Sequence, residues 1–171
     1  QRYRYRSRER IIDDLKTLST SGKKNYFFFA DSSVSVSAMQ KIATWIIESE
    51  IEIYWECEVR LEEKLTSDFC QFLFEGGCRN LIFGFESAAQ RVLDMMDKGT
   101  TVSGQRKVLE NCLSAGIGTN LQVFIGYPTE TAREDQETIS FLLENEHLIS
   151  SIAFGRFRLK KRSELYLNYQ K

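Results

Sequence analysis

Residues 51–58, IEIYWECE, decide the fold of this chain, because apolar and polar side chains alternate along them without a break. A period of two predicts a β-strand with one apolar face and one polar face. A strand buried on both faces of an open parallel sheet would instead be apolar throughout. Glu56 and Glu58 on the polar face therefore favour a curved sheet whose inner face is wet or filled by a ligand.

Helix patterns and strand patterns take turns on both sides of this segment. Apolar residues at helical spacing predict helices, and short apolar runs predict strands. The expected helices fall near residues 11–22, 39–47, 69–75, 92–96, 108–113 and 131–143, and the expected strands near 26–30, 51–58, 81–85, 121–125 and 152–159. Strands separated by helices must run parallel, since parallel neighbours need a crossover connection.

Two architectures accommodate this order, a (β/α) barrel and an open doubly wound sheet. Polar residues in phase on several strands favour the barrel, namely Glu56, Glu58, Arg60, Glu86, Gln122, Arg156 and Arg158. In the competing interpretation they face water on edge strands. The predicted fold class is thus α/β, a partial (β/α) TIM-like barrel with parallel strands and about five or six β/α units. We expect one domain over residues 1–171, with a lead-in at 1–6, β/α units at 7–159 and a C-terminal extension at 160–171.

Composition narrows the class of protein. The chain has 171 residues, 27% of them charged, and a net charge of −1, which gives no electrostatic reason to expect nucleic acid or an anionic membrane. No apolar run approaches the roughly 18 residues of a membrane span.

The four cysteines have long, irregular spacings that fit neither a disulfide scaffold nor a C-x-x-C pair. They predict a reducing, cytoplasmic compartment. The chain does not start with methionine, so we interpret it as a fragment.

The ends of the predicted strands carry hydrogen-bonding groups, and barrel ligands bind at those ends. The groups are Asp31, Ser32 and Ser33, then Glu58 with Arg60, then Glu86 with Ser87, and finally residues 126–130. Carboxylates beside arginine and hydroxyls suit a zwitterionic ligand. Gly84 and Gly126 leave room for a flat ring to approach the backbone. Glu56 and Glu58 could form an acid–base pair, although a role in lining a polar interior is the simpler interpretation.

Several segments resemble radical S-adenosylmethionine (SAM) enzymes, in particular the branch often fused to cobalamin-binding domains. The matching segments, in family order, are 3–7 (YRYRS), 28–32 (FFADS), 55–60 (WECEVR), 84–93 (GFESAAQRVL), 96–99 (MDKG) and 124–131 (FIGYPTET). Ser32 replaces the second aspartate of the family's F-F-x-D-D pattern. Thr129 stands where the family's P-G-E-T turn has glycine.

The resemblance implies a binding site for SAM, residue by residue. Asp31 and Ser32 match the strand end that contacts the SAM amino group. Arg60, Glu86 and Ser87 match positions near the ribose or the methionyl carboxylate. Gln122, Phe124 and Gly126 match the strand that lies against the adenine. In such enzymes a [4Fe–4S] cluster reduces SAM to release a 5′-deoxyadenosyl radical.

The chain departs from the family at the cluster. The family's C-x-x-x-C-x-x-C loop is absent, so no metal ligand is expected here, and no catalytic residue can be named. Either the loop precedes this chain in a longer enzyme, or the protein has lost it. In the first case this is part of a radical SAM enzyme that is inactive alone. The alternative is a cluster-less barrel that binds SAM or a nucleotide as a scaffolding module.

Three further expectations concern other reactions and partners. A cluster-free lyase or aldolase would need a lysine at a strand tip, and Lys98 and the pair Lys160–Lys161 are expected to lie off the tips. The substrate, a small molecule or a peptide, cannot be read, and cobalamin would belong to a fused domain. Neither nucleic acid nor membrane is expected as a partner, and open sheet edges predict a dimer.

Overall fold

A single sheet of five parallel strands organises the molecule. The structure, a computed structural model, describes residues 6–22, 24–161 and 166. The strands are β1 (Tyr26–Phe29), β2 (Tyr54–Val59), β3 (Cys78–Glu86), β4 (Gly118–Ile125) and β5 (Ser151–Arg156). They lie in the order β1-β2-β3-β4-β5, and every neighbouring pair is parallel. The predicted fold class, a partial parallel (β/α) barrel, is confirmed.

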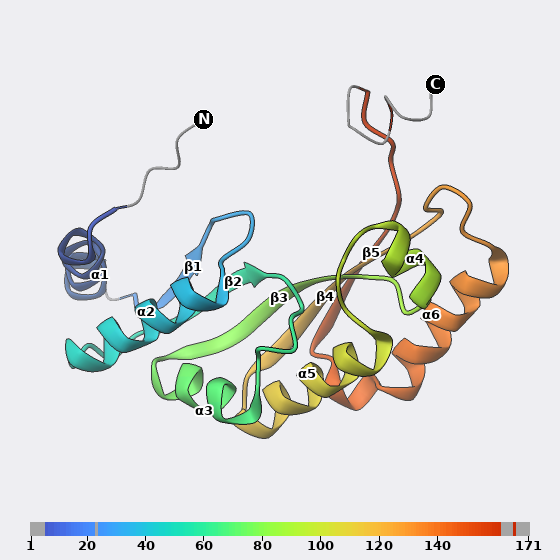
Figure 1. Cartoon of the computed structure of the whole chain (residues 1–171). Coiled ribbons are helices and arrows are strands. Elements are labelled where there is room, and N and C mark those ends of the chain that lie inside the picture. The colour runs from blue at the N-terminus through green and yellow to red at the C-terminus, as the bar shows by residue number, and fades with distance from the viewer. Residues whose placement is uncertain (1–5, 23, 162–165, 167–171) are drawn as a thin grey trace.

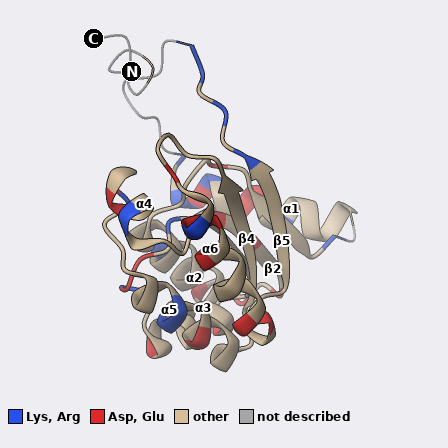
Figure 2. Cartoon of the chain, turned by 90° about the vertical axis from the view of Figure 1, so that its right-hand side faces the viewer, with Lys and Arg blue, Asp and Glu red and all other residues tan. Residues whose placement is uncertain are grey.

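Helices connect the strands in the predicted order. They are α1 (Arg8–Gly22), α2 (Val36–Glu48), α3 (Ser67–Glu75), α4 (Gln90–Met95), α5 (Val102–Ala115) and α6 (Ala132–Glu144), and a short 3₁₀ turn, η1 (Glu146–Leu148), precedes β5. Figures 1 and 2 show α2, α3, α5 and α6 on one face of the sheet; the opposite face carries none of these four helices and is called the bare face here. α1 packs beside α2 at the β1 end.

Hydroxyl residues start four of the helices. The side chains of Ser35, Thr66, Thr101 and Thr131 each accept a hydrogen bond from a backbone N–H of the first turn. At Thr131 the bond is reciprocated by the Glu134 carboxylate, which makes a capping box over residues 131–134. Gly116 ends α5 in the left-handed conformation, with φ of 80°.

The core lies between the sheet and the helix layer. The largest side chains that are fully buried there alternate along the strands and include Trp55, Leu81, Phe83, Phe85 and Leu121. The side chains between them point to the bare face and are only partly buried. The polar face deduced from residues 51–58 is therefore the inner face of the curved sheet, although β2 begins at Tyr54 and not at Ile51.

The register sets which inner-face residues are neighbours. Glu56 lies opposite Asn80, Ile82 opposite Asn120, and Gly84 opposite Gln122. The ladder shifts between Gly84 and Glu86, just where β3 reaches its carboxyl end. Most of the expected lead-in at 1–6 and most of the expected C-terminal extension at 160–171 lie outside the described residues.

Candidate functional site at the strand tips

Five of the predicted site residues lie along one edge of the sheet, because all five strands run the same way. Asp31 and Ser32 follow β1, Arg60 follows β2, Glu86 ends β3, and Gly126 follows β4. The loop after β1 is tied to the neighbouring strand by the Val34 N–H, which donates to the Glu58 carbonyl at 2.8 Å. Burial raises the pKa of Cys57 on β2, and the nearby charge of Asp31 raises it further.

Glu86 is the most tightly held of these residues. It is in the left-handed region, with φ of 67°, and its side chain is 15% exposed. Its Oε1 accepts a hydrogen bond from Lys98 Nζ at 2.6 Å, which closes an ion pair. A Cβ added to Gly84 would lie 2.9 Å from the same oxygen. The carboxylate is thus folded back over the bare backbone of Gly84.

Lys98 belongs to this edge, contrary to expectation. It was expected to lie off the strand tips, yet the loop between α4 and α5 turns inward through left-handed residues at Asp97 and Gly99 and delivers its ammonium group to Glu86. Arg60 Nη2 donates to the Lys98 carbonyl at 3.0 Å and so links the end of β2 to the same loop. Residues 96–99 had been matched as a segment, but their spacing does not reveal the path of the loop.

The inner face below the tips carries amides and carboxylates. Gln122 lies on β4 between Gly84 on β3 and Ala153 on β5. Lower down, Glu56 accepts hydrogen bonds from Asn80 Nδ2 at 2.8 Å and from the Tyr26 hydroxyl at 3.3 Å. With two protein donors already on Glu56, a role in lining the interior is better supported than acid–base chemistry.

The side chains of Ser87 and Phe124 contact other protein side chains. Ser87 is fully buried, and its hydroxyl shares hydrogen bonds with Thr138 Oγ1 at 3.0 Å and the Ala89 N–H at 3.1 Å. Any contact of Ser87 with a ligand would therefore have to come from its backbone. The Phe124 ring packs against Phe157, with the centroids 5.5 Å apart.

Gly126 keeps an open space at the end of β4. Its φ is 80°, and no atom of the described residues beyond its chain neighbours lies within 4 Å of where a Cβ would be. Its N–H donates to Glu130 Oε2 at 2.7 Å, as does that of Tyr127 at 2.9 Å. Burial raises the pKa of Glu130, partly offset by these two backbone bonds, and the nearby Asp135 raises it further.

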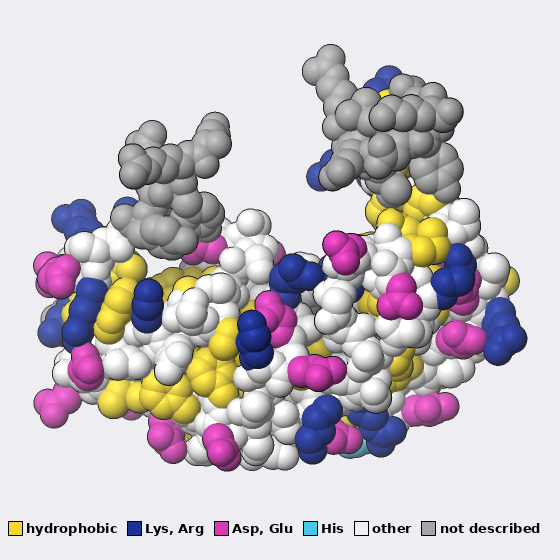
Figure 3. Space-filling view, in the orientation of Figure 1, with side chains coloured by type: hydrophobic (Ala, Val, Ile, Leu, Met, Phe, Trp, Pro, Cys, Tyr) yellow, Lys and Arg dark blue, Asp and Glu magenta, His cyan; other side chains and the backbone are white. Residues whose placement is uncertain are grey.

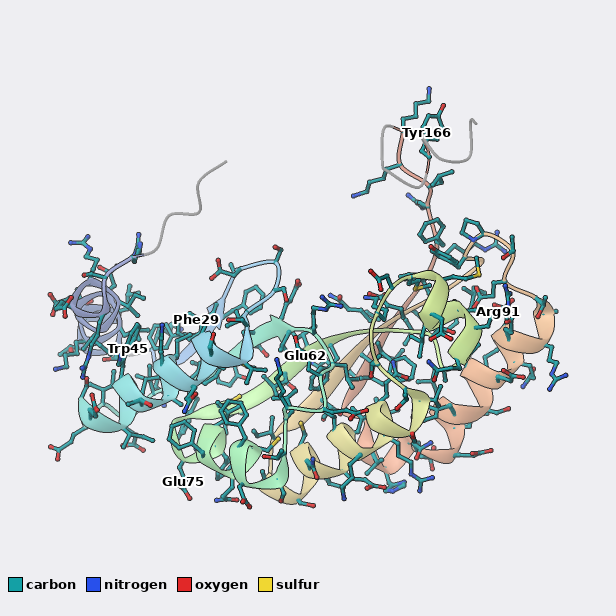
Figure 4. All side chains as sticks on the ribbon, viewed as in Figure 1. Phe29, Trp45, Glu62, Glu75, Arg91 and Tyr166 are labelled. Carbon is teal, nitrogen blue, oxygen red and sulfur yellow. The ribbon has the colours of Figure 1, made fainter. Side chains whose placement is uncertain are left out.

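Arg91 braces the same turn from α4 (Figure 4). Its guanidinium donates to both carboxylate oxygens of Glu134 at 2.7 Å and to the Thr129 carbonyl at 2.8 Å. The bond from Arg91, followed by bonds from Thr131, lowers the pKa of Glu134 to about 2. This brace fixes the start of α6 relative to α4.

The four cysteines do not form a cluster site. All are free and buried, and Cys57 and Cys78 point away from the inner face. Burial raises the pKa of Cys57 to about 12 and that of Cys78 well above its usual range, which disfavours the thiolate that metals need. Within residues 6–161, apart from 23, no three His, Cys, Asp or Glu side chains are grouped to hold a metal.

The surface has two hollows near α6, away from the inner face. One, of about 590 Å³, is lined by residues such as Val102, Phe141 and Glu144, and the other, of about 520 Å³, by Arg91, Thr129 and Glu134 among others. On the face seen in Figure 3, side chains of both charges are interspersed. No helix in the described part of the chain is long and apolar enough to cross a membrane.

The sequence has relatives among curated proteins, although no family model matches it. It is 27% identical over 139 residues to the anaerobic magnesium-protoporphyrin IX monomethyl ester cyclase of Rubrivivax gelatinosus, covering 80% of this chain and 25% of the relative. It is also 27% identical over 143 residues to an uncharacterized methyltransferase of Pyrococcus horikoshii, covering 82% and 31%. The chain thus spans about a quarter to a third of the relatives that it matches.

Solved structures extend the comparison to the fold. The radical SAM methyltransferase TsrM of Kitasatospora setae, described with cobalamin and a [4Fe–4S] cluster bound, superposes with a TM-score of 0.82 at 17% identity, covering 98% of this chain and 34% of TsrM. The cobalamin-dependent radical SAM enzyme OxsB gives 0.69 at 17% identity, covering 95% of this chain and 25% of OxsB. Coproporphyrinogen III oxidase (HemN) of Escherichia coli gives 0.63 at 11%, covering 95% and 39%.

The chain has the parallel β/α fold of the barrel core found in these radical SAM enzymes. The predicted resemblance to the radical SAM enzymes is confirmed, and two of the three structures named above are described as cobalamin-containing or cobalamin-dependent.

Proposed function

We propose that this chain is the SAM-binding part of the core of a radical SAM enzyme, within a longer protein. The observation that carries the proposal is the arrangement at the strand tips. Hydrogen-bonding groups on four neighbouring strands border two side-chain-free positions, Gly84 and Gly126, and the charged pair Glu86–Lys98 lies among them. A zwitterion with a flat ring matches this combination of charge and open backbone.

Each group has a role in the proposal. Asp31 and Ser32 bind the ligand's amino group, and Arg60 and Glu86 bind the ribose or the methionyl carboxylate, with Ser87 contributing through its backbone. The adenine lies along β4, where Gln122, Phe124 and Gly126 are found. A SAM molecule held by these residues would supply the 5′-deoxyadenosyl group for radical chemistry. This chain's residues orient the ligand and exclude water.

The cluster does not fit this chain, because all four thiols are buried in the core between the sheet and the helix layer, away from the inner face. In the proposal its ligands lie in a C-x-x-x-C-x-x-C loop outside residues 1–171, cobalamin belongs to a fused domain, and this chain alone is inactive. We also propose that residues 1–171 form one domain and that the free thiols reflect a cytoplasmic location. The substrate, a small molecule or a peptide, contacts parts of the enzyme beyond this chain.

Binding of SAM by the full-length protein tests the proposal. We expect saturable heat on titration with SAM, and about tenfold weaker binding by Gln122→Ala. Gln71→Ala is the matched control, because Gln71 is exposed on α3 and bonds only to Glu75 among the described residues. Absence of heat at millimolar SAM, or equal weakening by both variants, would overturn the assignment.

The second candidate, a cluster-less binding or scaffolding module, is favoured by one observation, the missing cysteine triad. The two candidates predict different sequences upstream of this chain and a different iron content of the purified protein. A radical SAM enzyme must encode C-x-x-x-C-x-x-C upstream of the segment beginning at Gln1, and the purified protein must take up iron. A protein that binds SAM but has neither feature is the scaffolding module.

A further inference from the structure

Two of the four cysteines lie in contact between α3 and α5. The Sγ atoms of Cys70 on α3 and Cys112 on α5 are 3.9 Å apart, although the two residues are 42 positions apart in the sequence. Both side chains are fully buried, and both thiols are free. A disulfide bond is about 2.05 Å long, so an approach of about 2 Å by the two sulfurs would join the helices covalently.

Hydrogen bonds hold the two helices together at the same point. The side-chain amide of Asn111, next to Cys112, donates from Nδ2 to the Leu65 carbonyl at 2.9 Å. The Cys70 thiol donates to the same carbonyl at 3.8 Å. Leu65 lies just before α3, and Figure 1 shows α3 beside α5 in the helix layer. Because these contacts converge on one place, the fold restrains the distance between the two sulfurs.

Cys70 differs from Cys57 and Cys78 in its ionisation. The hydrogen bond from the Cys112 thiol lowers the pKa of Cys70, although burial opposes this shift. The pKa values of Cys57 and Cys78 are raised, chiefly by burial. The thiolate is the form that attacks a disulfide. Cys70 is therefore the more readily activated nucleophile, and Cys112 lies beside it as the thiol that completes the bond.

We infer that Cys70 and Cys112 form a reversible redox site, in which a small disulfide oxidant of the oxidised glutathione type joins α3 to α5 through a disulfide bond. The Cys70 thiolate attacks the S–S bond of the oxidant, and one glutathione leaves as a thiolate that takes up the proton. The Cys112 thiol then loses its proton, attacks the Cys70 sulfur and releases the second glutathione. The two cysteines lose two electrons, and the oxidant is reduced to two thiols. This site is independent of SAM binding.

Complete burial makes the oxidation slow but keeps it selective. The oxidant reaches Cys70 only when α3 and α5 separate, so local opening limits the rate. As the helices close again, Cys112 meets the modified sulfur, whereas the Cys78 thiol donates to the Asn80 carbonyl at 3.7 Å. An excess of small thiols runs the same exchange backward. In a reducing compartment the bond is therefore transient, as redox-sensing disulfides are.

Peptide mapping of the full-length protein tests the inference without any substitution. The protein is incubated with oxidised glutathione under native conditions, its free thiols are blocked, and it is digested without reduction. We expect a Cys70 peptide linked to a Cys112 peptide, about tenfold more abundant than any other linkage among the four cysteines of this chain, and removed by dithiothreitol. Glutathione on Cys70 alone, a Cys70–Cys78 linkage, or no modification of Cys70 would each overturn the inference.

Oxidation in concentrated urea shows whether the fold selects the pair. The unfolded chain should give mixed linkages, because nothing then holds the two sulfurs together. The same preference for Cys70–Cys112 in urea would overturn the claim that the folded structure sets it.

Single substitutions supply the matched controls. In Cys112→Ala, Cys70 should keep glutathione as a mixed disulfide, whereas Cys57→Ala, which removes an equally buried thiol, should form the linkage as the wild type does. Thermal melting before oxidation shows whether each variant is folded. The oxidised wild type should melt at a higher temperature than the reduced protein, because the bond restrains the unfolded chain. A lower melting temperature would mean that the fold must distort to form the bond, and would overturn the inference.

Discussion

At the scale of single residues, the Arg91–Glu134 pair makes the stability of the fold depend on pH. The pKa of Glu134 is lowered to about 2 by Arg91 first and then by Thr131. A carboxyl whose pKa falls on folding stabilises the fold above its unfolded pKa, about 4.3, and that contribution is lost as the pH falls toward 2. We expect Glu134→Gln to lower the urea midpoint near neutral pH, with the deficit shrinking on acidification. Glu137→Gln, on the same helix and exposed, should show little change at either pH.

The contribution of Glu130 to stability changes with pH in the direction opposite to that of Glu134. Burial, with a contribution from Asp135, raises its pKa, so the stability that it provides is present in acid and is lost as the pH rises through the raised value. Glu130 Oε1 and Asp135 Oδ1 are both buried, and neither has a hydrogen-bond partner among the residues that the structure describes. Glu130→Gln keeps an oxygen for the Gly126 and Tyr127 N–H groups and adds a donor for Asp135. It should therefore raise stability by about 1 kcal/mol at about pH 8, with less gain in acid, in urea titrations. A loss of stability at about pH 8 would contradict this.

Sequence reasoning placed the strand-tip residues on one edge because parallel strands share a direction, and Asp31, Arg60 and Glu86 do lie there. It missed Lys98, since the conformation of a loop depends on left-handed turns that no periodicity reports. It also could not see that the Ser87 hydroxyl is engaged by Thr138, a residue 51 positions away. Contacts of this kind are set by tertiary packing.

At the scale of elements, the crossing of α2 and α3 depends on one small residue. A Cβ on Gly76 would lie 2.5 Å from the Ala43 Cβ and 2.7 Å from its Cα, and the Gly76 carbonyl accepts the Trp55 indole N–H at 2.7 Å. Because backbone must move, Gly76→Ala should cost about 1–3 kcal/mol of unfolding free energy in urea titrations. Gly22→Ala, with a contact of 3.6 Å only, should cost far less. Equal stabilities would show that α2 shifts freely.

The order of helices and strands was predictable from the periodicity, because this signal is local. Helix starts were less accurate, and α5, expected near 108–113, spans Val102–Ala115. The bounds of the strands were also harder to predict than their order. β2 starts three residues after Ile51, and β5 ends at Arg156 and not at Leu159. Ile152 and Phe154 are 43% and 51% exposed although they sit in an apolar strand. Periodicity identifies an apolar face, but it does not tell whether another element covers that face.

At the scale of the whole molecule, β1 and β5 are the two edge strands of the sheet, and no strand of the described residues pairs with their outer sides. We propose that the isolated chain associates through them, because unpaired strand edges template further pairing. Light scattering after size exclusion should show a dimer or a larger species, and Phe154→Lys on β5 should shift it toward monomer. Leu113→Lys, which changes an equally exposed residue on α5, should not. A clean wild-type monomer would remove the proposal.

The complete burial of Cys57, Cys70, Cys78 and Cys112 has a practical consequence. A thiol-reactive dye can modify these sulfurs only after the barrel opens, so the rate of modification reports the frequency of opening events. Because the four lie in different elements, from β2 to α5, identifying the modified cysteine by mass spectrometry would show which part of the molecule breathes first.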